Sequence, residues 1–360
     1  MKKTKKLIVL ILAFALVISA FAMASCEGAS GDKLKVGVAM PTQSLQRWNQ
    51  DGAYLKEKLE EAGYEVDLQY ANNDVAMQVS QIENMITGGC DILVIASIDG
   101  SSLGNALEEA ANEDIPVIAY DRLLMETPNV SYYATFDNYM VGTIQGQFIR
   151  DSLDLDNASG PFNIELFAGS PDDNNARFFF QGAYDVLLPY IESGKLNVVS
   201  GQQDFEDIAI LAWSTETAQN RMDDLLTAHY ATGETLDVVL SPNDSIAIGI
   251  ANALDNSGFT PGEDWPIVTG QDCDVPNMKN IIAGKQSMSI FKDTRTLADQ
   301  TVAMVTAIAE DKEVPVNDTE TYHNGEKIVD TFLCEPVFAD INNYEELLID
   351  SGYYTAEELQ

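Results

Sequence analysis

Planar polar side chains and indoles recur directly after the apolar segments that we expect to form strands. Carboxylates accept pairs of hydrogen bonds, Arg and Lys donate them, and Asn does both. Adjacent hydroxyls of a polyol offer this mixture, and the row of C–H groups on a pyranose face suits an indole. The set therefore favours a small neutral polyol over an anion or a hydrophobic ligand. Its members are Gln43, Arg47, Trp48, Asp121, Arg122, Asp173, Asn174, Asn175, Arg177, Trp213, Asn243, Asp244, Asp272 and Lys292.

Most of these residues also have an ordinary structural explanation. The alternatives are a core position for Trp48, a surface ion pair for Asp121–Arg122, a helix N-cap for Asp173 and for Asn243–Asp244, an exposed loop position for Trp213 and a solvated turn for Lys292–Asp293. The binding interpretation depends on the shared location of these residues at strand ends and not on any one of them.

Motifs for common cofactors and catalytic groups do not occur in the chain. The turn at residues 40–44 has no glycine, unlike a nicotinamide-binding turn, and there is no Walker A motif and no Gly-x-Ser-x-Gly elbow. Two histidines, His229 and His323, leave little material for a histidine metal site or a Ser-His-Asp triad. The acidic segment 154–160 lacks the oxygen spacing of a calcium loop. We expect no cofactor and no metal, whereas glycoside hydrolysis needs only two carboxylates and stays open.

An alternation of apolar strands and amphipathic helices must position the candidate residues. Strands that are apolar throughout, each followed by a helix, predict parallel sheets covered on both faces. The alternation restarts after a break near Asp137, which predicts two doubly wound α/β lobes. The expected strands are 34–40, 66–70, 91–96 and 115–120 in the first half, then 163–168, 197–200, 237–240, 266–270 and 286–291.

Asp121 and Asp272 occupy equivalent places in the two halves. Each follows the C-terminal end of an expected strand. In open α/β sheets that edge is where ligands bind. If the two lobes face each other, these carboxylates line opposite walls of one cleft.

Composition excludes several classes of protein. The 360 residues include 57 acidic and 20 basic side chains, a formal charge of -37, which repels nucleic acid and disfavours adsorption on anionic lipid. With 46% hydrophobic residues, the composition is too apolar for a disordered protein and too mixed for a polytopic membrane protein. The length allows about two domains.

The N-terminal segment is typical of an export signal. Four lysines within residues 2–6 precede an apolar run from Leu7 to Ala24. Residues 23–26, Met-Ala-Ser-Cys, resemble a bacterial lipobox, in which the cysteine becomes the lipidated N-terminus. We therefore expect a signal peptide over 1–25, lipidation of Cys26 and a polar tether over 26–33; an uncleaved membrane anchor is the alternative.

The three remaining cysteines, Cys90, Cys273 and Cys334, have no regular spacing. An odd number without such spacing argues against a disulfide framework and against a zinc cluster. Cys90 and Cys334 adjoin apolar segments, so we expect buried thiols there.

Several stretches of the chain resemble the periplasmic monosaccharide-binding proteins of ABC importers, and in particular the xylose-binding and multiple-sugar-binding branch. They occur in order over nearly the whole chain after the signal segment. The stretches are 46–48 (Gln-Arg-Trp), 80–85, 119–122 (Ala-Tyr-Asp-Arg), 135–138, 169–176, 270–272 (Gly-Gln-Asp), 290–293 and 352–354 (Gly-Tyr-Tyr).

The resemblance implies a type I periplasmic binding protein fold, with two lobes joined by three hinge strands. The first lobe would comprise 34–136 plus about 292–325, and the second 137–291 plus about 326–360. The resemblance also implies sugar-binding roles for Arg47, Trp48, Asp121 and Arg122 of the first lobe, for Asp173, Asn175, Arg177, Trp213, Asn243 and Asp272 of the second, and for Lys292 at a hinge crossing.

The implied function is capture of a monosaccharide, an aldose such as xylose, arabinose, glucose or galactose, for an ABC permease. The protein would be a monomeric lipoprotein at the outer face of the cytoplasmic membrane, or periplasmic, and would touch the membrane only through its lipid. A sugar-sensing receptor that reports to a histidine kinase or a chemoreceptor is the alternative. A secreted carbohydrate-active enzyme is a third hypothesis.

Overall fold

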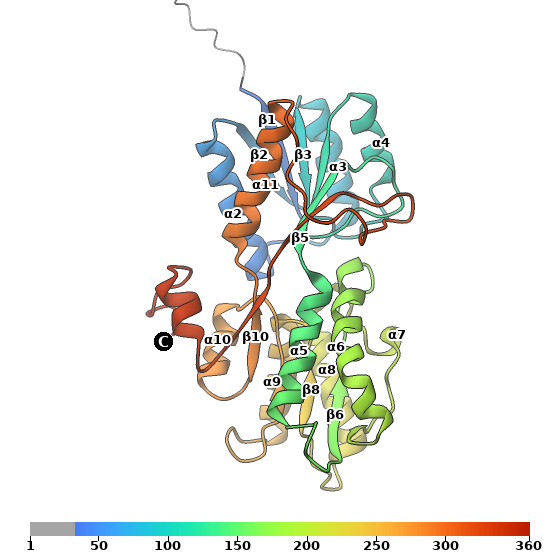
Figure 1. Ribbon diagram of the computed structural model, residues 1–360, viewed down its shortest axis with the longest axis vertical. Coiled ribbons are helices and arrows are strands. Elements are labelled where there is room, and N and C mark those ends of the chain that lie inside the picture. Colours follow the sequence, from blue (N-terminus) through green and yellow to red (C-terminus); the bar gives the residue numbers. More distant parts are fainter. Residues whose placement is uncertain (1–32) are drawn as a thin grey trace, which may run out of the picture. The chain divides into compact units, whose positions relative to one another are not determined.

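The structure is a computed structural model that describes residues 33–360. The expected signal peptide, the lipidation site Cys26 and nearly all of the expected tether lie outside the described residues. The described fold forms one unit over Lys35–Gln360, in which we distinguish two lobes by their sheets (Figure 1).

The first lobe is built on a six-stranded sheet in the order β11-β5-β4-β3-β1-β2, and every neighbouring pair is parallel. Helices α2 and α11 cover one face, and α3 and α4 cover the other (Figure 1). The strands are β1 (Lys35–Met40), β2 (Glu65–Tyr70), β3 (Ile92–Ile95), β4 (Val117–Tyr120), β5 (Tyr132–Phe136) and β11 (Thr331–Cys334), and the helices are α2 (Gln46–Glu61), α3 (Val75–Thr87), α4 (Gly104–Asn112) and α11 (Thr294–Ala309).

Strand β1 shows why the sequence forms this layered lobe. Successive side chains of a strand point to opposite faces. Val36 and Val38 pack into the core beneath α2 and α11, whereas Ala39 packs into the core beneath α3. A strand that is apolar on both faces is therefore covered by helices on both sides.

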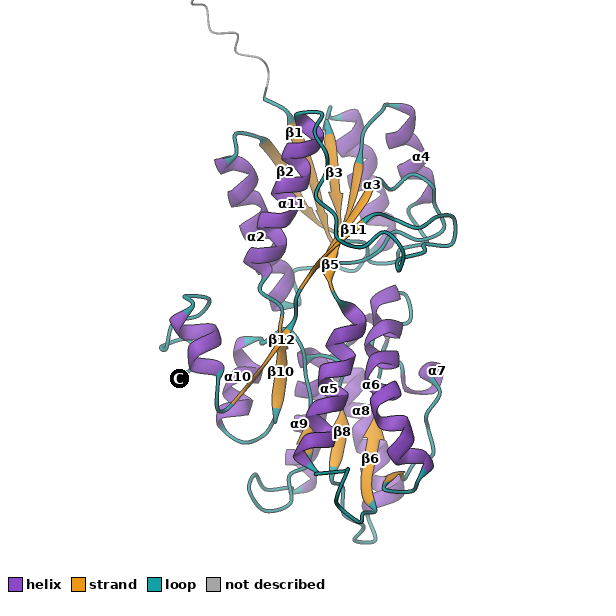
Figure 2. Cartoon of the chain, viewed as in Figure 1, coloured by secondary structure: helices purple, strands orange, loops and turns teal. Residues whose placement is uncertain are grey.

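The second lobe has a four-stranded parallel sheet in the order β7-β6-β8-β9 and a separate antiparallel pair, β10 with β12. Figure 2 shows helices in front of and behind the four-stranded sheet. The strands are β6 (Phe162–Leu166), β7 (Leu196–Val198), β8 (Val238–Leu240), β9 (Ile267–Val268), β10 (Met288–Phe291) and β12 (Val337–Asp340). The helices are α5 (Asn138–Ser152), α6 (Asn174–Glu192), α7 (Phe205–Ile208), α8 (Thr215–Leu225), α9 (Asp244–Ser257) and α10 (Val275–Ile282). A 3-10 turn, η1 (Leu211–Trp213), and two π-helical turns, η2 (Leu226–Tyr230) and η3 (Glu345–Asp350), complete the lobe.

Helices α5 and α6 pack closely because glycines lie between them. A Cβ atom on Gly142 would lie 1.9 Å from the carbonyl oxygen of Phe179, and one on Gly182 would lie 2.1 Å from that of Tyr139. This close packing holds α6 against α5, and the start of α6 carries part of the site described below.

The chain passes between the lobes three times: from β5 to α5, from β10 to α11, and from β11 to β12. The first passage lies at the predicted break near Asp137. The third corrects an expected boundary. Strand β11 pairs with β5 of the first sheet, so the chain stays in the first lobe through Cys334 and does not leave it near residue 326.

The two doubly wound parallel sheets confirm the predicted fold class, but three strands were missed. Strands β5, β11 and β12 were not among the expected strands, and the strand expected at 286–291 pairs antiparallel with β12 instead of extending a parallel sheet. Strands β11 and β12 have only four residues each, too few for an alternating pattern to be distinctive.

The three cysteines of the described part are buried and unpaired, which confirms the prediction of buried thiols for Cys90 and Cys334. Between residues 33 and 360 no helix is both long and apolar enough to cross a bilayer. Within the same range, no group of three or more His, Cys, Asp or Glu side chains is placed to hold a metal ion.

Candidate functional site

A polar cavity lies between the two lobes at the C-terminal ends of their strands. The unfilled space between its side chains is about 310 Å³, including the part that opens to solvent. Its lining contains ten of the eleven residues predicted to bind the ligand. The lining residues are Leu45, Arg47, Trp48, Asp121, Arg122, Asp173, Asn175, Phe179, Trp213, Asn243, Gln271, Asp272 and Lys292.

Arg47 is held in place by carboxylates of the first lobe. It lies in the first turn of α2, which follows β1. Its Nε donates to Oδ2 of Asp51 at 2.9 Å, and its Nη2 lies 3.0 Å from Oδ2 of Asp121. The Tyr120 hydroxyl donates to the other Asp51 oxygen at 2.5 Å. Two buried carboxylates of the first lobe therefore orient Arg47, independently of its contacts with the second lobe.

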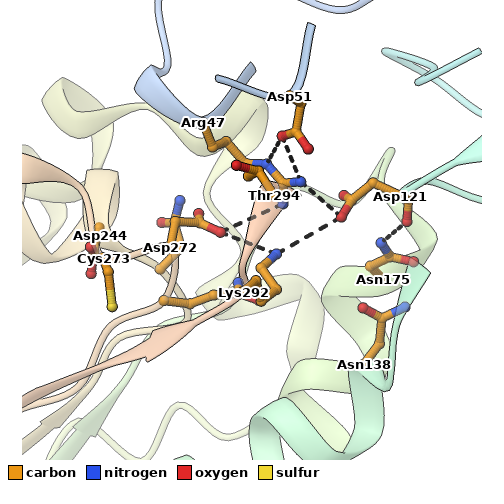
Figure 3. A network of polar contacts seen from close by, with 12 residues as sticks. Arg47, Asp51, Asp121, Asn138, Asn175, Asp244, Asp272, Cys273, Lys292 and Thr294 are labelled. Carbon is orange, nitrogen blue, oxygen red and sulfur yellow. Dashed lines mark hydrogen bonds and ion pairs between the residues drawn. The ribbon is translucent and has the colours of Figure 1, made fainter. Parts of the chain in front are cut away.

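Asp272 of the second lobe faces the same guanidinium. Its Oδ1 lies 3.5 Å from Nη1 of Arg47 and 3.1 Å from Nζ of Lys292 (Figure 3). The Lys292 ammonium also lies 4.0 Å from Oδ2 of Asp121. Two cations and two carboxylates therefore join the lobes. This arrangement agrees with the prediction that Asp121 and Asp272 line opposite walls of one cleft.

The backbone at both carboxylates adopts an unusual conformation. The φ angles are +58° at Asp121 and +102° at Asp272. Positive φ is uncommon outside glycine, although Asp tolerates it better than most residues. Strained backbone of this kind clusters at ligand sites, and here it lies where two carboxylates meet their cations.

Burial and charge set the ionisation of this group. Burial alone would lower the pKa of the Arg47 guanidinium, but the charges of Asp121, Asp51 and Asp272 raise that pKa well above its ordinary value. Burial alone would raise the pKa of Asp121, but Arg47, Lys292 and Arg122 lower it below its ordinary value. The cavity therefore presents a permanent cation beside a permanent anion, which suits a ligand with both acceptors and donors.

A second ion pair joins the lobes beside the first. Nε of Arg122 lies 3.0 Å from Oδ2 of Asp173, and both side chains are buried. Asp173 also caps α6 by accepting from the backbone N–H of Asn175. The Asn175 amide donates to the carbonyl of Asp121 at 2.6 Å. The predicted capping role of Asp173 is confirmed and is compatible with its place in the cavity.

Two indoles, Trp48 and Trp213, are part of the cavity wall. Trp48 is in contact with two guanidinium groups: Cζ of Arg47 and Cζ of Arg122 lie 4.4 and 5.1 Å from its ring centre. Trp213 packs on Gly169, where a Cβ would lie 2.0 Å from the indole ring. Within residues 33–360, Nε1 of each indole is buried without a hydrogen-bond partner. Each N–H is therefore free to donate to a ligand.

The structure decides between most of the alternatives raised by the sequence. Trp48 is both a core residue of the first lobe and part of the cavity wall. Asp121–Arg122 is not a surface pair, Lys292 is not in a solvated turn, and Trp213 is not exposed, because all are buried. Asn243 caps α9, as predicted, and also lines the cavity. Asp244 is buried behind it and bonds to Ser289 and Gln286.

Arg177, predicted to bind the ligand, is not among the residues that line the cavity. Its Nη2 pairs with Oε1 of Glu206 at 2.7 Å, and half of its side chain, 51%, is exposed. The reason is helical geometry. Residues two apart on a helix do not share a face, so Arg177 points away when Asn175 points into the cavity.

Several residues of the site were not predicted from the sequence. Phe179, four residues after Asn175, shares its helical face and lines the cavity. Asp51 stands in the same relation to Arg47 and supports it. Both could have been found from the period of the helix. No comparable pattern in the sequence indicates that Leu45 and Gln271 line the cavity.

Two facing α/β lobes with a polar cavity at their strand ends define a ligand-binding protein whose ligand contacts both lobes. Comparison with known proteins agrees with this class. Residues 36–313 match the family model described as periplasmic binding protein domain, and the chain belongs to this family. Because it is a family of binding proteins, the chain is not an enzyme.

Individual relatives are similar over nearly their whole length. The chain is 52% identical over 332 residues to the multiple sugar-binding periplasmic receptor ChvE of Rhizobium radiobacter, covering 92% of this chain and 94% of that one. It is 35% identical over 331 residues to the D-xylose-binding periplasmic protein of Escherichia coli, covering 92% and 94%. A crystal structure of an ABC transporter solute binding protein from Clostridium phytofermentans with bound β-D-glucose superimposes with a TM-score of 0.88 at 63% identity, covering 91% of this chain and 100% of that one.

Proposed function

We propose that this protein binds one monosaccharide, an aldose such as glucose or xylose, between its lobes and delivers it to an ABC permease. The observation that carries the proposal is the group Arg47, Asp121, Asp272 and Lys292, which joins the lobes inside the cavity. Carboxylate oxygens left free by the cations can accept from sugar hydroxyls, and the remaining N–H groups of the cations can donate to them.

The relatives support the same class of ligand. The protein that is 63% identical was crystallised with β-D-glucose, and the two relatives described above are named for multiple sugars and for D-xylose. The charges of the cavity agree with a neutral sugar, because three cations (Arg47, Arg122, Lys292) are matched by three carboxylates (Asp121, Asp173, Asp272).

Sugar binding would be coupled to closure of the lobes. A ligand shifts an open–closed equilibrium only by its difference in affinity for the two states. A sugar that touches both walls gains its second set of contacts only when the lobes close. The closed surface would then be the form that the permease recognises.

We further propose which residues bind the sugar and where the protein is located. Ten side chains bind the sugar: Arg47, Trp48, Asp121, Arg122, Asp173, Asn175, Trp213, Asn243, Asp272 and Lys292. A monomeric protein is anchored by a lipid on Cys26 at the outer face of the cytoplasmic membrane, and the described lobes follow a short tether. Replacing Cys26 with Ser should release the protein from the membrane fraction; continued membrane association would contradict the anchor.

A thermal-shift panel tests the ligand class. Xylose, arabinose, glucose, galactose, ribose and fructose are added separately, with L-glucose as a control for nonspecific effects. A sugar at about 100 times its dissociation constant should stabilise the protein by about 2.7 kcal/mol. If none of these sugars raises the melting temperature above that in L-glucose, the proposed ligand class is wrong.

The alternative of a sugar-sensing receptor uses the same binding site, and one relative is named a receptor. Sugar uptake by cells that lack the protein separates the two roles. Transport predicts that uptake is lost, whereas a purely sensory role predicts that uptake continues.

A further inference from the structure

The first turn of α2, which carries Arg47 and Trp48, has no local cap. The N-cap position is Leu45, whose side chain makes no capping hydrogen bond. Helices α3, α5, α6, α8, α9 and α11 each begin with a capping Asp, Asn or Ser. Because uncapped first turns fray more readily, the position of this turn depends on other contacts.

Besides the contacts of Arg47 within the first lobe, two come from the second lobe through Gln46. Its Nε2 donates to the Tyr354 hydroxyl at 2.7 Å, and its Oε1 accepts from the backbone N–H of Val275 at 3.2 Å. Both ends of the amide are thus bonded to the second lobe. Gln46 directly precedes Arg47 in the chain, so these bonds fix the start of the helix that forms one wall of the cavity.

Gln50, one helical turn later, extends the contact. Its Nε2 donates to the Tyr354 hydroxyl at 3.2 Å, and its Oε1 accepts from the Tyr353 hydroxyl at 3.2 Å. The Tyr353 hydroxyl also lies 3.0 Å from Oγ1 of Thr294. Two glutamines of α2 are therefore joined to two adjacent tyrosines by three hydrogen bonds.

The tyrosines are firmly part of the second lobe. Both are nearly buried, and they belong to a hydrophobic cluster with Ile281 of α10 and Leu348 of η3. The Tyr353 ring packs edge-on against Phe291 of β10. Neither tyrosine lines the sugar cavity, and neither do Gln46 and Gln50. The contact is therefore separate from the site that it adjoins.

We propose that Tyr353 and Tyr354, with Gln46 and Gln50, form a latch outside the cavity that holds the start of α2 against the second lobe and so increases sugar affinity. They are positioning residues, which act through Arg47 and Trp48. This inference rests on the proposed sugar-binding function. A contact that favours the closed arrangement raises the fraction of molecules competent to hold the sugar, and affinity rises with that fraction.

Tyr354→Phe tests the latch, because it removes the hydroxyl that two glutamines share and keeps the ring in the cluster. Sugar affinity should fall on the order of tenfold, as expected for two hydrogen bonds, while the melting temperature without sugar stays close to that of the wild type. Tyr344→Phe is the matched control: it removes a tyrosine hydroxyl from the same C-terminal segment that bonds only to Glu345 among the described residues. The control should bind like the wild type.

Gln46→Ala and the double variant complete a double-mutant cycle. The two single variants share only the Gln46–Tyr354 bond, because Tyr354 also accepts from Gln50 and Gln46 also accepts from Val275. If that shared bond contributes to sugar affinity, the loss of affinity in the double variant should be smaller than the sum of the two single losses. Additive losses, or affinity of Tyr354→Phe within about twofold of the wild type, would overturn the latch. A lower melting temperature with unchanged affinity would do the same, since it indicates a purely structural role. If the wild type itself bound no sugar, the proposed function would fail before the latch was tested.

Discussion

Nη1 of Arg47 lies 3.5 Å from Oδ1 of Asp272, and this ion pair joins the first helix of one lobe to the loop after β9 of the other. Both side chains are more than nine-tenths buried. Charges removed from water are stable only when they are paired. The buried charges of Arg47 and Asp272 are therefore paired with each other only when the two lobes approach each other.

Neutralising either aspartate should remove most of the sugar affinity. Truncating one partner of a buried charge pair costs about 2–5 kcal/mol, so Asp121→Asn and Asp272→Asn should each weaken binding by about 30-fold or more. Isothermal titration calorimetry measures the loss, and circular dichroism checks that the fold is intact. Wild-type affinity in either variant would exclude that residue from the sugar site.

Arg177→Ala should leave sugar binding unchanged. Its partner is Glu206, both side chains are at least half exposed, and exposed pairs contribute at most about 1 kcal/mol to stability. The same calorimetric titration applies. A clear loss of affinity would show that Arg177 reaches the cavity in the sugar-bound protein.

Gly169→Ala should weaken sugar binding by displacing Trp213. A Cβ at this position would lie 2.0 Å from the indole ring, so the ring must move out of the cavity wall. We expect about tenfold weaker binding, in the range of a lost aromatic contact. Gly104→Ala is the control, because its Cβ would meet no atom within 4 Å. Equal affinity of the two variants would contradict the role of Trp213.

Stability should fall as the pH rises toward neutral. Burial and then the charge of Asp272 raise the pKa of Asp274 to about 7, and burial raises that of Asp51 to about 6 despite Arg47. The ordinary value is 3.8, so the folded protein holds both protons more tightly than the unfolded chain. These two groups therefore contribute most to the free energy of unfolding near pH 4 and below, and their contribution is lost as the pH rises through 6 and 7.

Asp274→Asn isolates one of these groups. An amide cannot ionise, so the variant should lose less stability between pH 5 and pH 8 than the wild type, with the contribution of Asp51 remaining. Urea unfolding at the two pH values measures the difference. The same decrease in both proteins would show that Asp274 does not titrate in this range.

The sequence predicted the two-lobe fold because long apolar strands, such as Lys35–Met40, are unambiguous. It did not reveal β5, β11 and β12, whose existence depends on pairing with distant segments: β11 pairs with β5 across about 200 residues of chain. The hinge boundary near residue 326 was misplaced for the same reason. The local period of apolar residues does not indicate which distant segment a strand pairs with.

The site was largely predictable because strand ends of α/β sheets converge. The position of Arg177 outside the cavity and the omission of Phe179 have one cause: residues were chosen by type and proximity without applying the helical period. The latch through Tyr354 could not be derived, because Gln46 and Tyr354 are 308 residues apart and meet only when both lobes are assembled.

Calorimetric titration of the wild-type protein with D-glucose and D-xylose tests the central claim most directly. We expect one sugar per chain, with an affinity near micromolar, about -8.2 kcal/mol, for at least one of the two. Absence of saturable heat with both sugars, and with arabinose and galactose tested in the same way, would contradict a monosaccharide site between the lobes.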